Sequence, residues 1–260
     1  MVARTRREPP RFRRVVVRRV EPRSPRLLRV TFTGPELEGL TVEHPAASVR
    51  LLLPSSASGE LVLPAWNGNE FLLADGRRPV IRTFTPRRVD REALELDLEI
   101  VLHGAGAASA WAEALESDAP AAISGPGRGY VVDRDAPAFL LAGDETAIPA
   151  ISQLLEILPP EIPTQVRIEV AHPDARLALP GTNAVVEWRD LPSGSVPGTA
   201  LVAAVRDADL ADGTLVWAAG EAAAVQRIRR HLFDERGLSR AETWVRGYWQ
   251  LGRRGDTDNA

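Results

Sequence analysis

The chain of 260 residues contains no cysteine, and all of its basic residues are arginines, since the sequence has no lysine. Without cysteine there can be no disulfide, no thiolate nucleophile and no zinc ligated by cysteine. Without lysine there can be no Schiff-base lysine and no phosphate-binding lysine of a Walker-type loop. Because iron–sulfur clusters are usually held by cysteine thiolates, the absence of cysteine also means that the chain cannot hold its own iron–sulfur centre by the usual ligation.

The sequence also has little net charge, and we expect neither a signal peptide in its first residues nor a stretch long enough to span a membrane. The formal net charge of −3 argues against a dedicated nucleic-acid-binding protein. The arginine-rich residues 1–10 are not followed by an apolar segment, so we expect a disordered basic arm there and a cytoplasmic protein. With 44% hydrophobic residues the chain can bury a full core, and its length predicts one large or two medium domains.

The first half, from Phe12 to about Ile123, has the pattern of β-structure. Short runs rich in Val, Leu, Ile and Thr are separated by turn-forming residues. The expected strands are Arg13–Val20, Arg26–Thr33, Ser48–Leu53, Val80–Arg87 and Ala93–Leu102. Leu94–Ile100 alternates strictly between apolar and acidic residues, so we expect one buried and one wet face. Strands at this spacing favour an antiparallel barrel or sandwich.

The second half alternates buried strands with helices, which predicts a parallel α/β sheet. The expected strands are Ala138–Gly143, Val166–Ala171, Ala184–Trp188, Ala200–Val205, Leu215–Ala219 and Thr243–Tyr248. Thr146–Leu158 and Glu221–Glu235 have helical spacing. In such sheets, ligands lie beyond the carboxyl ends of the strands. The loops in that position contain no G-x-G-x-x-G fingerprint, and Asp144 and Glu145 would repel a phosphate.

Two segments in the first half carry the strongest chemical signals. Arg82–Arg87 combines a cation, an aromatic ring and hydroxyls, the set that a flavin dinucleotide needs, although alone it also fits a solvated β-edge. In an extended strand, side chains alternate between faces, whereas a bend would let three of them converge on one ligand. His103–Gly106 precedes the expected helix Ala107–Leu115, which favours either an anion site at the helix start or an ordinary junction.

These segments match a known family. Arg82–Arg87 resembles the R-x-[YF]-T-x-R flavin motif of siderophore-interacting proteins, the vibriobactin-utilisation type of FAD-dependent ferric-siderophore reductase. Val101–Ala112 resembles the second flavin segment of that family, H-G-x-G-P-A-S-x-W-A, and Gly125–Gly129 its interdomain G-P-x-G. Ala142–Ile151 matches the signature A-G-D-E-T-A-[LI]-P-A-I, and Gly247–Trp249 resembles the terminal G-Y-W.

The resemblance covers about residues 12–252 and implies the ferredoxin-reductase-like fold. We expect an N-terminal antiparallel β-barrel flavin domain at 11–128 and a C-terminal parallel α/β domain for a nicotinamide nucleotide at 129–252. The remaining residues, 253–260, are expected to form a disordered tail.

The resemblance also implies roles for individual residues. Arg82 would bind the FAD phosphate, Phe84 would cover one face of the isoalloxazine, and Thr85 would reach the ring edge. The further residues that the resemblance assigns to FAD are Thr83, Arg87, His103, Ala107, Ala108 and Ser109. The residues assigned to the nicotinamide side, or to closure over the cofactors, are Asp144, Glu145, Thr146, Tyr248 and Trp249. Two departures from the family pattern are Ala107 in place of proline and Gln250 in place of the arginine that often follows the terminal tryptophan.

The implied activity is reduction of siderophore-bound iron(III) by NADPH or NADH through FAD, which releases iron(II) because its bonds to hard oxygen donors are weaker. A flavin couples a two-electron donor to a one-electron acceptor, so no catalytic side chain and no protein-bound metal are required. A ferric siderophore is often anionic, and Arg246 and then Arg128 are the candidate cations for binding it. The rival interpretations are a flavin reductase that serves another acceptor, such as free flavin or a ferredoxin, and a carrier without turnover.

The choice of nucleotide depends on the segment that follows the expected strand Val166–Ala171. There the chain carries both Asp174, which would favour the free 2′-hydroxyl of NADH, and Arg176, which would favour the 2′-phosphate of NADPH. Asp174 follows Pro173 and is able to cap a local turn instead. We therefore expect Arg176 to decide, and NADPH to be preferred.

Overall fold

The structure is a computed structural model that describes residues 9–54, 59–103, 107–180 and 183–252. The expected basic arm, apart from residues 9 and 10, and the expected tail at 253–260 lie outside the described residues. Within the part of the chain that the structure describes, no helix has the length and apolar character needed to span a membrane.

The chain divides into two compact units. The first comprises Met1–Arg23 and Leu27–Gly129, and the second comprises Ser24–Arg26 and Tyr130–Ala260. The short segment Ser24–Arg26, at the turn after the first strand, is therefore grouped with the second unit.

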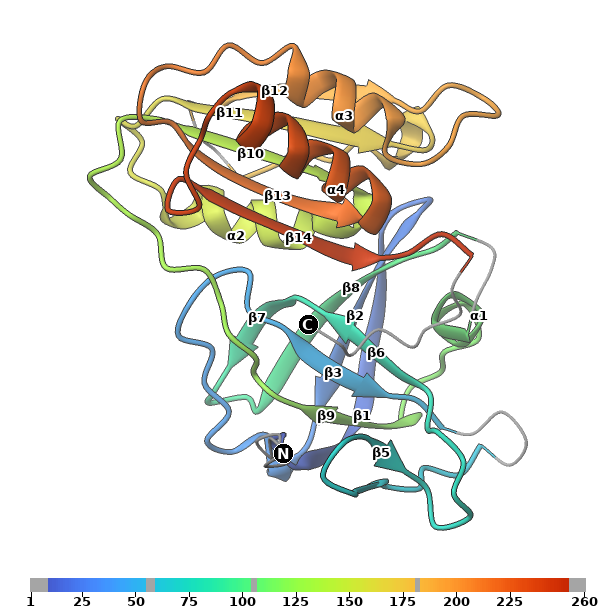
Figure 1. Cartoon of the computed structure of the whole chain (residues 1–260). Coiled ribbons are helices and arrows are strands. Elements are labelled where there is room, and N and C mark those ends of the chain that lie inside the picture. Colours follow the sequence, from blue (N-terminus) through green and yellow to red (C-terminus); the bar gives the residue numbers. More distant parts are fainter. Residues whose placement is uncertain (1–8, 55–58, 104–106, 181–182, 253–260) are drawn as a thin grey trace, which may run out of the picture. The chain divides into compact units, whose positions relative to one another are not determined.

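The first unit is built on one antiparallel sheet of seven strands, in the order β6-β3-β9-β1-β2-β8-β7 (Figure 1). The strands are β1 (Phe12–Ser24), β2 (Leu27–Thr33), β3 (Val49–Leu52), β6 (Ile81–Phe84), β7 (Pro86–Asp90), β8 (Glu95–Val101) and β9 (Pro120–Ser124). β6 and β7 lie at opposite ends of this order, although a single residue, Thr85, separates them in the chain. The sheet must therefore curl until its two edges approach each other, which forms the expected barrel.

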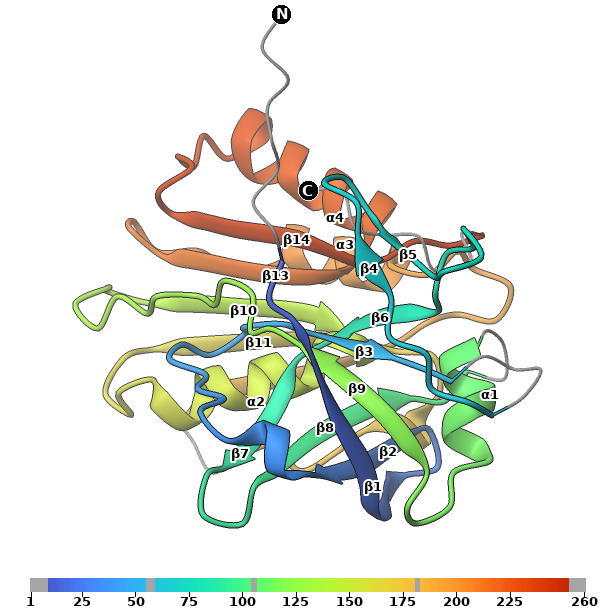
Figure 2. The same ribbon diagram turned by 90° about the horizontal axis from the view of Figure 1, so that it is seen from below.

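The strand expected at Val80–Arg87 is thus two strands with a break at Thr85. Smaller elements complete this unit, and Figure 2 shows the β4–β5 hairpin beside the barrel strands. They are η1 (Pro35–Leu37), β4 (Ala65–Trp66), β5 (Phe71–Leu72) and α1 (Ala107–Glu113). The barrel interior is filled by buried apolar side chains from most strands, among them Val30, Phe32, Leu51, Leu96, Leu98 and Ile123.

The expectation of a wet face on β8 is wrong. Glu95, Asp97 and Glu99 have exposed fractions of 9%, 4% and 7%. Neighbouring strands supply their partners: Thr31 Oγ1 donates to Asp97 at 2.6 Å and Arg29 Nη2 to Glu99 at 2.7 Å. Strict alternation identifies the apolar face correctly, but it does not reveal that arginines on β1 and β2 cover the acidic face.

The second unit contains a parallel sheet of five strands, in the order β12-β11-β10-β13-β14. The strands are β10 (Phe139–Asp144), β11 (Thr164–Val170), β12 (Val185–Asp190), β13 (Leu215–Glu221) and β14 (Thr243–Trp249). In Figure 1, α2 (Ile148–Ile157) covers one face of this sheet, and α3 (Thr199–Arg206) and α4 (Ala222–Arg230) cover the other. The short 3-10 helices are η2 (Glu145–Ala147) and η3 (Pro173–Ala175), and the π-helix η4 (His231–Glu235) directly continues α4. The strand order reverses at β10, and in open parallel sheets the position beyond the carboxyl end of such a strand is the usual place for a ligand.

The strand expected at Ala200–Val205 is wrong, because these residues lie in the helix α3. The buried positions Leu201, Val202 and Val205 repeat with helical spacing and share one apolar cluster with buried residues of α4. A short apolar run fits a buried strand and a buried helix equally well, so its periodicity does not distinguish them.

Candidate functional site

The flavin segment, Arg82–Arg87, lies where the barrel closes. Arg82 and Phe84 on β6 pair with Leu51 and Val49 of β3, and Pro86 opens β7 opposite Leu98 of β8. Proline has no N–H to donate, which suits the first residue of an edge strand. The segment therefore passes from one edge of the sheet to the other within a single residue.

This change of strand decides which side chains of the segment are buried. Thr83 is exposed, whereas Thr85 is only 7% exposed, so the two threonines do not share one environment as they would in an unbroken strand. Phe84 is half-buried and packs against the barrel core. The segment thus has the bend that would allow neighbouring side chains to contact one ligand.

The two arginines of the flavin segment are both half-buried. Arg82 donates from Nη1 to the carbonyl oxygen of Ile81 at 2.7 Å, which holds its guanidinium close to the strand. A guanidinium that is fixed against the backbone loses little freedom when it binds a phosphate.

The second flavin segment is organised by Ser109. Its hydroxyl accepts the backbone N–H of His103 at 3.2 Å and donates to Glu113 Oε1 at 3.2 Å, and its side chain is buried. The His103 side chain and Ala107 are exposed, and Ala108 is half-buried. The glycines between His103 and Ala107 lie outside the described residues. Ser109 therefore connects the backbone of His103 to the helix α1 from a buried position.

In the second unit, Asp144 at the end of β10 joins several elements. Its Oδ1 accepts the backbone N–H and the hydroxyl of Thr146 at 2.9 and 2.5 Å. Its Oδ2 accepts the backbone N–H of Glu221 at 2.9 Å and the indole N–H of Trp249 at 2.8 Å. Burial raises the pKa of Asp144 to about 6, against the opposing effect of these hydrogen bonds.

Glu145 is likewise turned inward. It accepts the backbone N–H of Ala171 at 2.7 Å and pairs with Arg26 Nε at 3.0 Å, and only 6% of it is exposed. Thr146 is half-buried. Asp144 and Glu145, which the sequence assigns to the nicotinamide side, are therefore both turned into the protein. Their hydrogen bonds connect the end of β10 to neighbouring elements of the second unit.

An aromatic cluster lies on β13 and β14. The fully buried Trp217 stacks on Trp244 with ring centroids 5.0 Å apart, and Tyr248 meets Trp217 edge-on at 6.3 Å. The exposed Arg246 lies with its guanidinium 4.9 Å from the centroid of the Trp244 ring. Stacking on an indole fixes the orientation of Arg246 and leaves its charge accessible to an anion.

The other two arginines that the sequence singles out lie on the surface. Arg176 Nη2 pairs with Asp190 Oδ2 at 2.6 Å, and both side chains are more than 40% exposed. Arg128 is exposed at the end of the first unit. Neither position lies within a described cavity.

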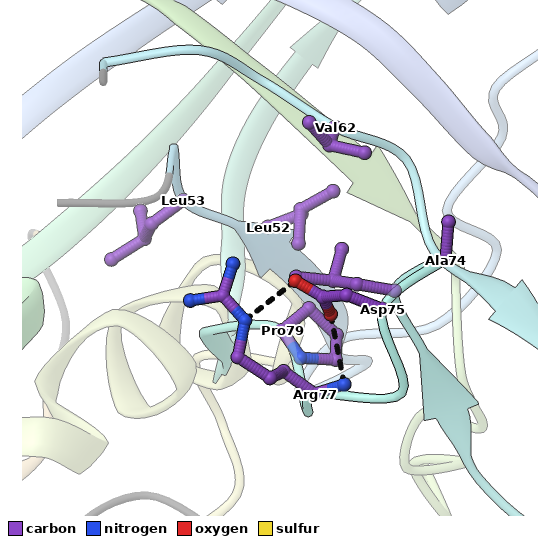
Figure 3. Close-up of a pocket in the computed structure, with 8 residues that line it drawn as sticks. Leu52, Leu53, Val62, Ala74, Asp75, Arg77 and Pro79 are labelled. Carbon is purple, nitrogen blue, oxygen red and sulfur yellow. Dashed lines mark hydrogen bonds and ion pairs between the residues drawn. The ribbon is translucent and has the colours of Figure 1, made fainter. Parts of the chain in front are cut away.

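A small cavity of about 180 Å³ opens in the first unit beside the end of β3 (Figure 3). It is lined mainly by apolar side chains, with the ion pair of Arg77 Nε and Asp75 Oδ2 at 2.6 Å among them. Its lining residues are Leu52, Leu53, Val62, Leu73, Ala74, Asp75, Arg77 and Pro79. This lining contains none of the residues that the sequence assigns to a cofactor, and we assign no ligand to it.

Sequence reasoning missed Glu169 and Glu221, which are 3% and 2% exposed at the carboxyl ends of β11 and β13. Glu169 is the one acidic residue of β11, and an acid at a buried strand position is a signal of a specific partner. Among the described residues, no group of three or more His, Asp or Glu side chains is arranged to hold a metal ion.

Comparison with known proteins decides the family. The model of the siderophore-interacting FAD-binding domain matches residues 16–130, and that of the siderophore-interacting protein matches residues 136–252. A siderophore utilization protein from T. fusca, known as a crystal structure, is 32% identical with a TM-score of 0.85, over 96% of this chain and 97% of that one. This chain belongs to the siderophore-interacting protein family. It therefore has the ferredoxin-reductase-like fold, with the FAD-binding domain of the family in its first unit.

Two curated relatives extend the comparison. The siderophore-interacting protein described here is 39% identical to an uncharacterized protein of Mycobacterium tuberculosis over 194 residues, which cover 70% of this chain and 69% of the relative. It is 29% identical to the ferric vibriobactin reductase ViuB of Vibrio cholerae over 245 residues, which cover 88% of this chain and 86% of ViuB.

The flavin segment suits the FAD that this family binds. A half-buried guanidinium, a half-buried aromatic ring and a buried threonine come from neighbouring positions at one bend of the barrel. These are the groups that bind a phosphate, cover an apolar ring and bond to its polar edge. The residues present therefore fit the cofactor.

Proposed function

We propose that this protein is an FAD-dependent reductase that transfers electrons from a reduced nicotinamide nucleotide, NADPH or NADH, to iron(III) held by a siderophore. The observation that carries the proposal is the position of Arg82, Phe84 and Thr85 at the closure of a barrel that matches the FAD-binding domain of siderophore-interacting proteins. The similarity to a ferric vibriobactin reductase over 88% of the chain supports the same acceptor.

In this proposal the chain contributes binding and orientation. Bound FAD supplies the redox chemistry, since it takes electrons in pairs and passes them on singly. Arg82 holds the FAD phosphate, Phe84 covers the ring and Thr85 bonds to the ring edge. Thr83, Arg87, His103 and the first turn of α1 complete the cofactor site.

Arg246 is the cation that we assign to the ferric siderophore. Its guanidinium is exposed and is held over Trp244, so a single positive charge is presented in a fixed orientation. Many ferric siderophores carry negative charge, and an oriented cation attracts and orients such a substrate. Arg128 is the second candidate because it too is exposed.

The test is an anaerobic turnover assay with the purified protein, NADPH or NADH, and a ferrous chelator that traps the product. We expect the rate of iron(II) formation from ferric siderophores to exceed the rate at which added free flavin is reduced. Preferential reduction of free flavin or of a ferredoxin would assign the protein to another acceptor. Binding of the siderophore without any iron(II) would assign it to a carrier.

A further inference from the structure

The carboxyl edge of the parallel sheet is filled by carboxylates of the chain itself. Asp144, Glu169 and Glu221 lie at or near the ends of three adjacent strands, β10, β11 and β13, and Glu145 follows Asp144 directly. All four side chains are buried, with exposed fractions between 2% and 7%. In sheets of this type, the same edge normally faces the phosphates of a dinucleotide.

Each carboxylate bonds to backbone N–H groups that a phosphate would otherwise use. Glu169 accepts the N–H of Gly198 at 2.6 Å and of Leu201 at 2.9 Å, and so occupies the N-terminus of α3 with both of its oxygens. Glu221 accepts the N–H of Ala224 at 2.9 Å and caps α4. Free N–H groups and the positive end of the helix dipole make such termini attractive to anions. In this protein the carboxylates of Glu169 and Glu221 already occupy the N-termini of α3 and α4.

The glycine at the end of β13 serves the same internal arrangement. Gly220 has φ of +155°, and a Cβ atom built there would lie 2.6 Å from Asp144 Oδ2. In a dinucleotide-binding loop, a glycine allows the backbone to approach the pyrophosphate. In this protein the missing side chain makes room for a carboxylate instead.

The charge of this edge also opposes a second anion. The cation bonded to Glu145 is Arg26, so the charge of Arg26 is already compensated. A pyrophosphate placed here would meet buried negative charge and backbone donors that are already bonded.

We infer that the carboxyl edge excludes the pyrophosphate of a dinucleotide, and that the nicotinamide donor is recognised without its adenosine half, with Glu169 and Glu221 as the residues that set this specificity. The inference deepens the proposed function and rests on it for the identity of the donor. It is an alternative to the expectation that Arg176, which pairs with Asp190 at 2.6 Å, selects NADPH.

The kinetic test compares NADPH, NADH and reduced nicotinamide mononucleotide as donors to the FAD-loaded protein in stopped-flow measurements. We expect second-order rate constants for flavin bleaching that agree within about threefold, since the adenosine half adds no binding energy that is specific to one donor. Arg176→Ala is the control, and it should change none of the three. A mononucleotide rate lower by a hundredfold or more, or a loss confined to NADPH in Arg176→Ala, would overturn the inference.

A binding test separates this inference from the proposed function, because it does not depend on turnover. Isothermal titration of the FAD-loaded protein with ADP-ribose and its 2′-phosphate should give no binding at micromolar concentrations, and tight binding of either would contradict the inference. Glu169→Ala should acquire thermal stabilisation by ADP-ribose that Glu169→Gln, which keeps the side chain in place, lacks. If Glu169→Ala gains no such stabilisation, Glu169 does not exclude the pyrophosphate. If no reduced nicotinamide bleaches the flavin and ADP-ribose also fails to bind, the proposal that a nicotinamide nucleotide is the electron donor is wrong. The inference that the carboxyl edge excludes a pyrophosphate still stands in that case.

Discussion

Trp249 donates its indole N–H to the buried carboxylate of Asp144 at 2.8 Å, and so joins the last strand of the sheet to the first. The two residues are 105 positions apart in the sequence. The family signature and the terminal G-Y-W are therefore parts of one structural unit, in which a single carboxylate holds β10, the start of α4 and β14 together.

The first prediction concerns this contact. Trp249→Phe should lower the free energy of unfolding by about 1–3 kcal/mol, because the mutation leaves a buried charged acceptor without one of its donors. The measurement is urea unfolding, with Asp144→Asn and the double variant to complete a mutant cycle. Additive effects of the two mutations would show that the contact contributes nothing of its own.

The second prediction concerns pH. The pKa of Asp144 in the folded protein, about 6, lies above its ordinary value of 3.8, so the folded protein binds this proton more tightly than the unfolded chain. Stability from this group is thus gained as the pH falls from about 6 towards 4, and lost as the pH rises through about 6. A difference of this size between the folded and unfolded pKa corresponds to a few kcal/mol of stability.

This pH effect is measured as the difference in unfolding free energy between the wild type and Asp144→Asn at pH 4.5 and pH 7. The wild type should gain stability relative to the variant at the lower pH, because the amide does not titrate. An equal difference at both values would mean that Asp144 has an ordinary pKa.

The third prediction concerns FAD affinity. Arg82→Ala should weaken FAD binding by roughly 10- to 100-fold, since a hydrogen bond to a charged group contributes about 1.5–3 kcal/mol. Arg87→Ala is the matched control from the same segment and should have the smaller effect. Equilibrium titration of the apoprotein with FAD measures both. A larger loss in Arg87→Ala would reverse the roles assigned to the two arginines.

The fourth prediction concerns the ring edge. Thr85→Val keeps the shape of a side chain that is 7% exposed and removes only its hydroxyl. FAD should stay bound, while the reduction potential or the turnover rate changes, because a group at the ring edge adjusts the electronics of the cofactor. Thr83→Val, at the exposed neighbouring position, is the control. If potential and turnover both remain as in the wild type, Thr85 does not touch the ring.

The sequence predicts the barrel and the parallel sheet well because apolar periodicity and turn residues are local signals. It fails at Thr85 and in α3, where the outcome depends on contacts with distant strands and helices. Alternation along β8 does not show that its acids are covered, since the covering arginines come from β1 and β2. The motif positions of the site are also visible in the sequence, but the inward orientation of Asp144 and Glu145 is not, because their partners Trp249 and Arg26 lie far away in the chain.

The most direct test of the central claim is a single-turnover titration of the FAD-loaded protein, reduced anaerobically and mixed with a ferric siderophore. The account predicts rapid reoxidation of the flavin, with about two iron(II) trapped for each FAD, as expected for a two-electron cofactor and a one-electron acceptor. Arg246→Ala should slow this step while leaving FAD bound. A reduced flavin that stays bleached in the presence of ferric siderophore, with no iron(II) in the trap, would contradict the account.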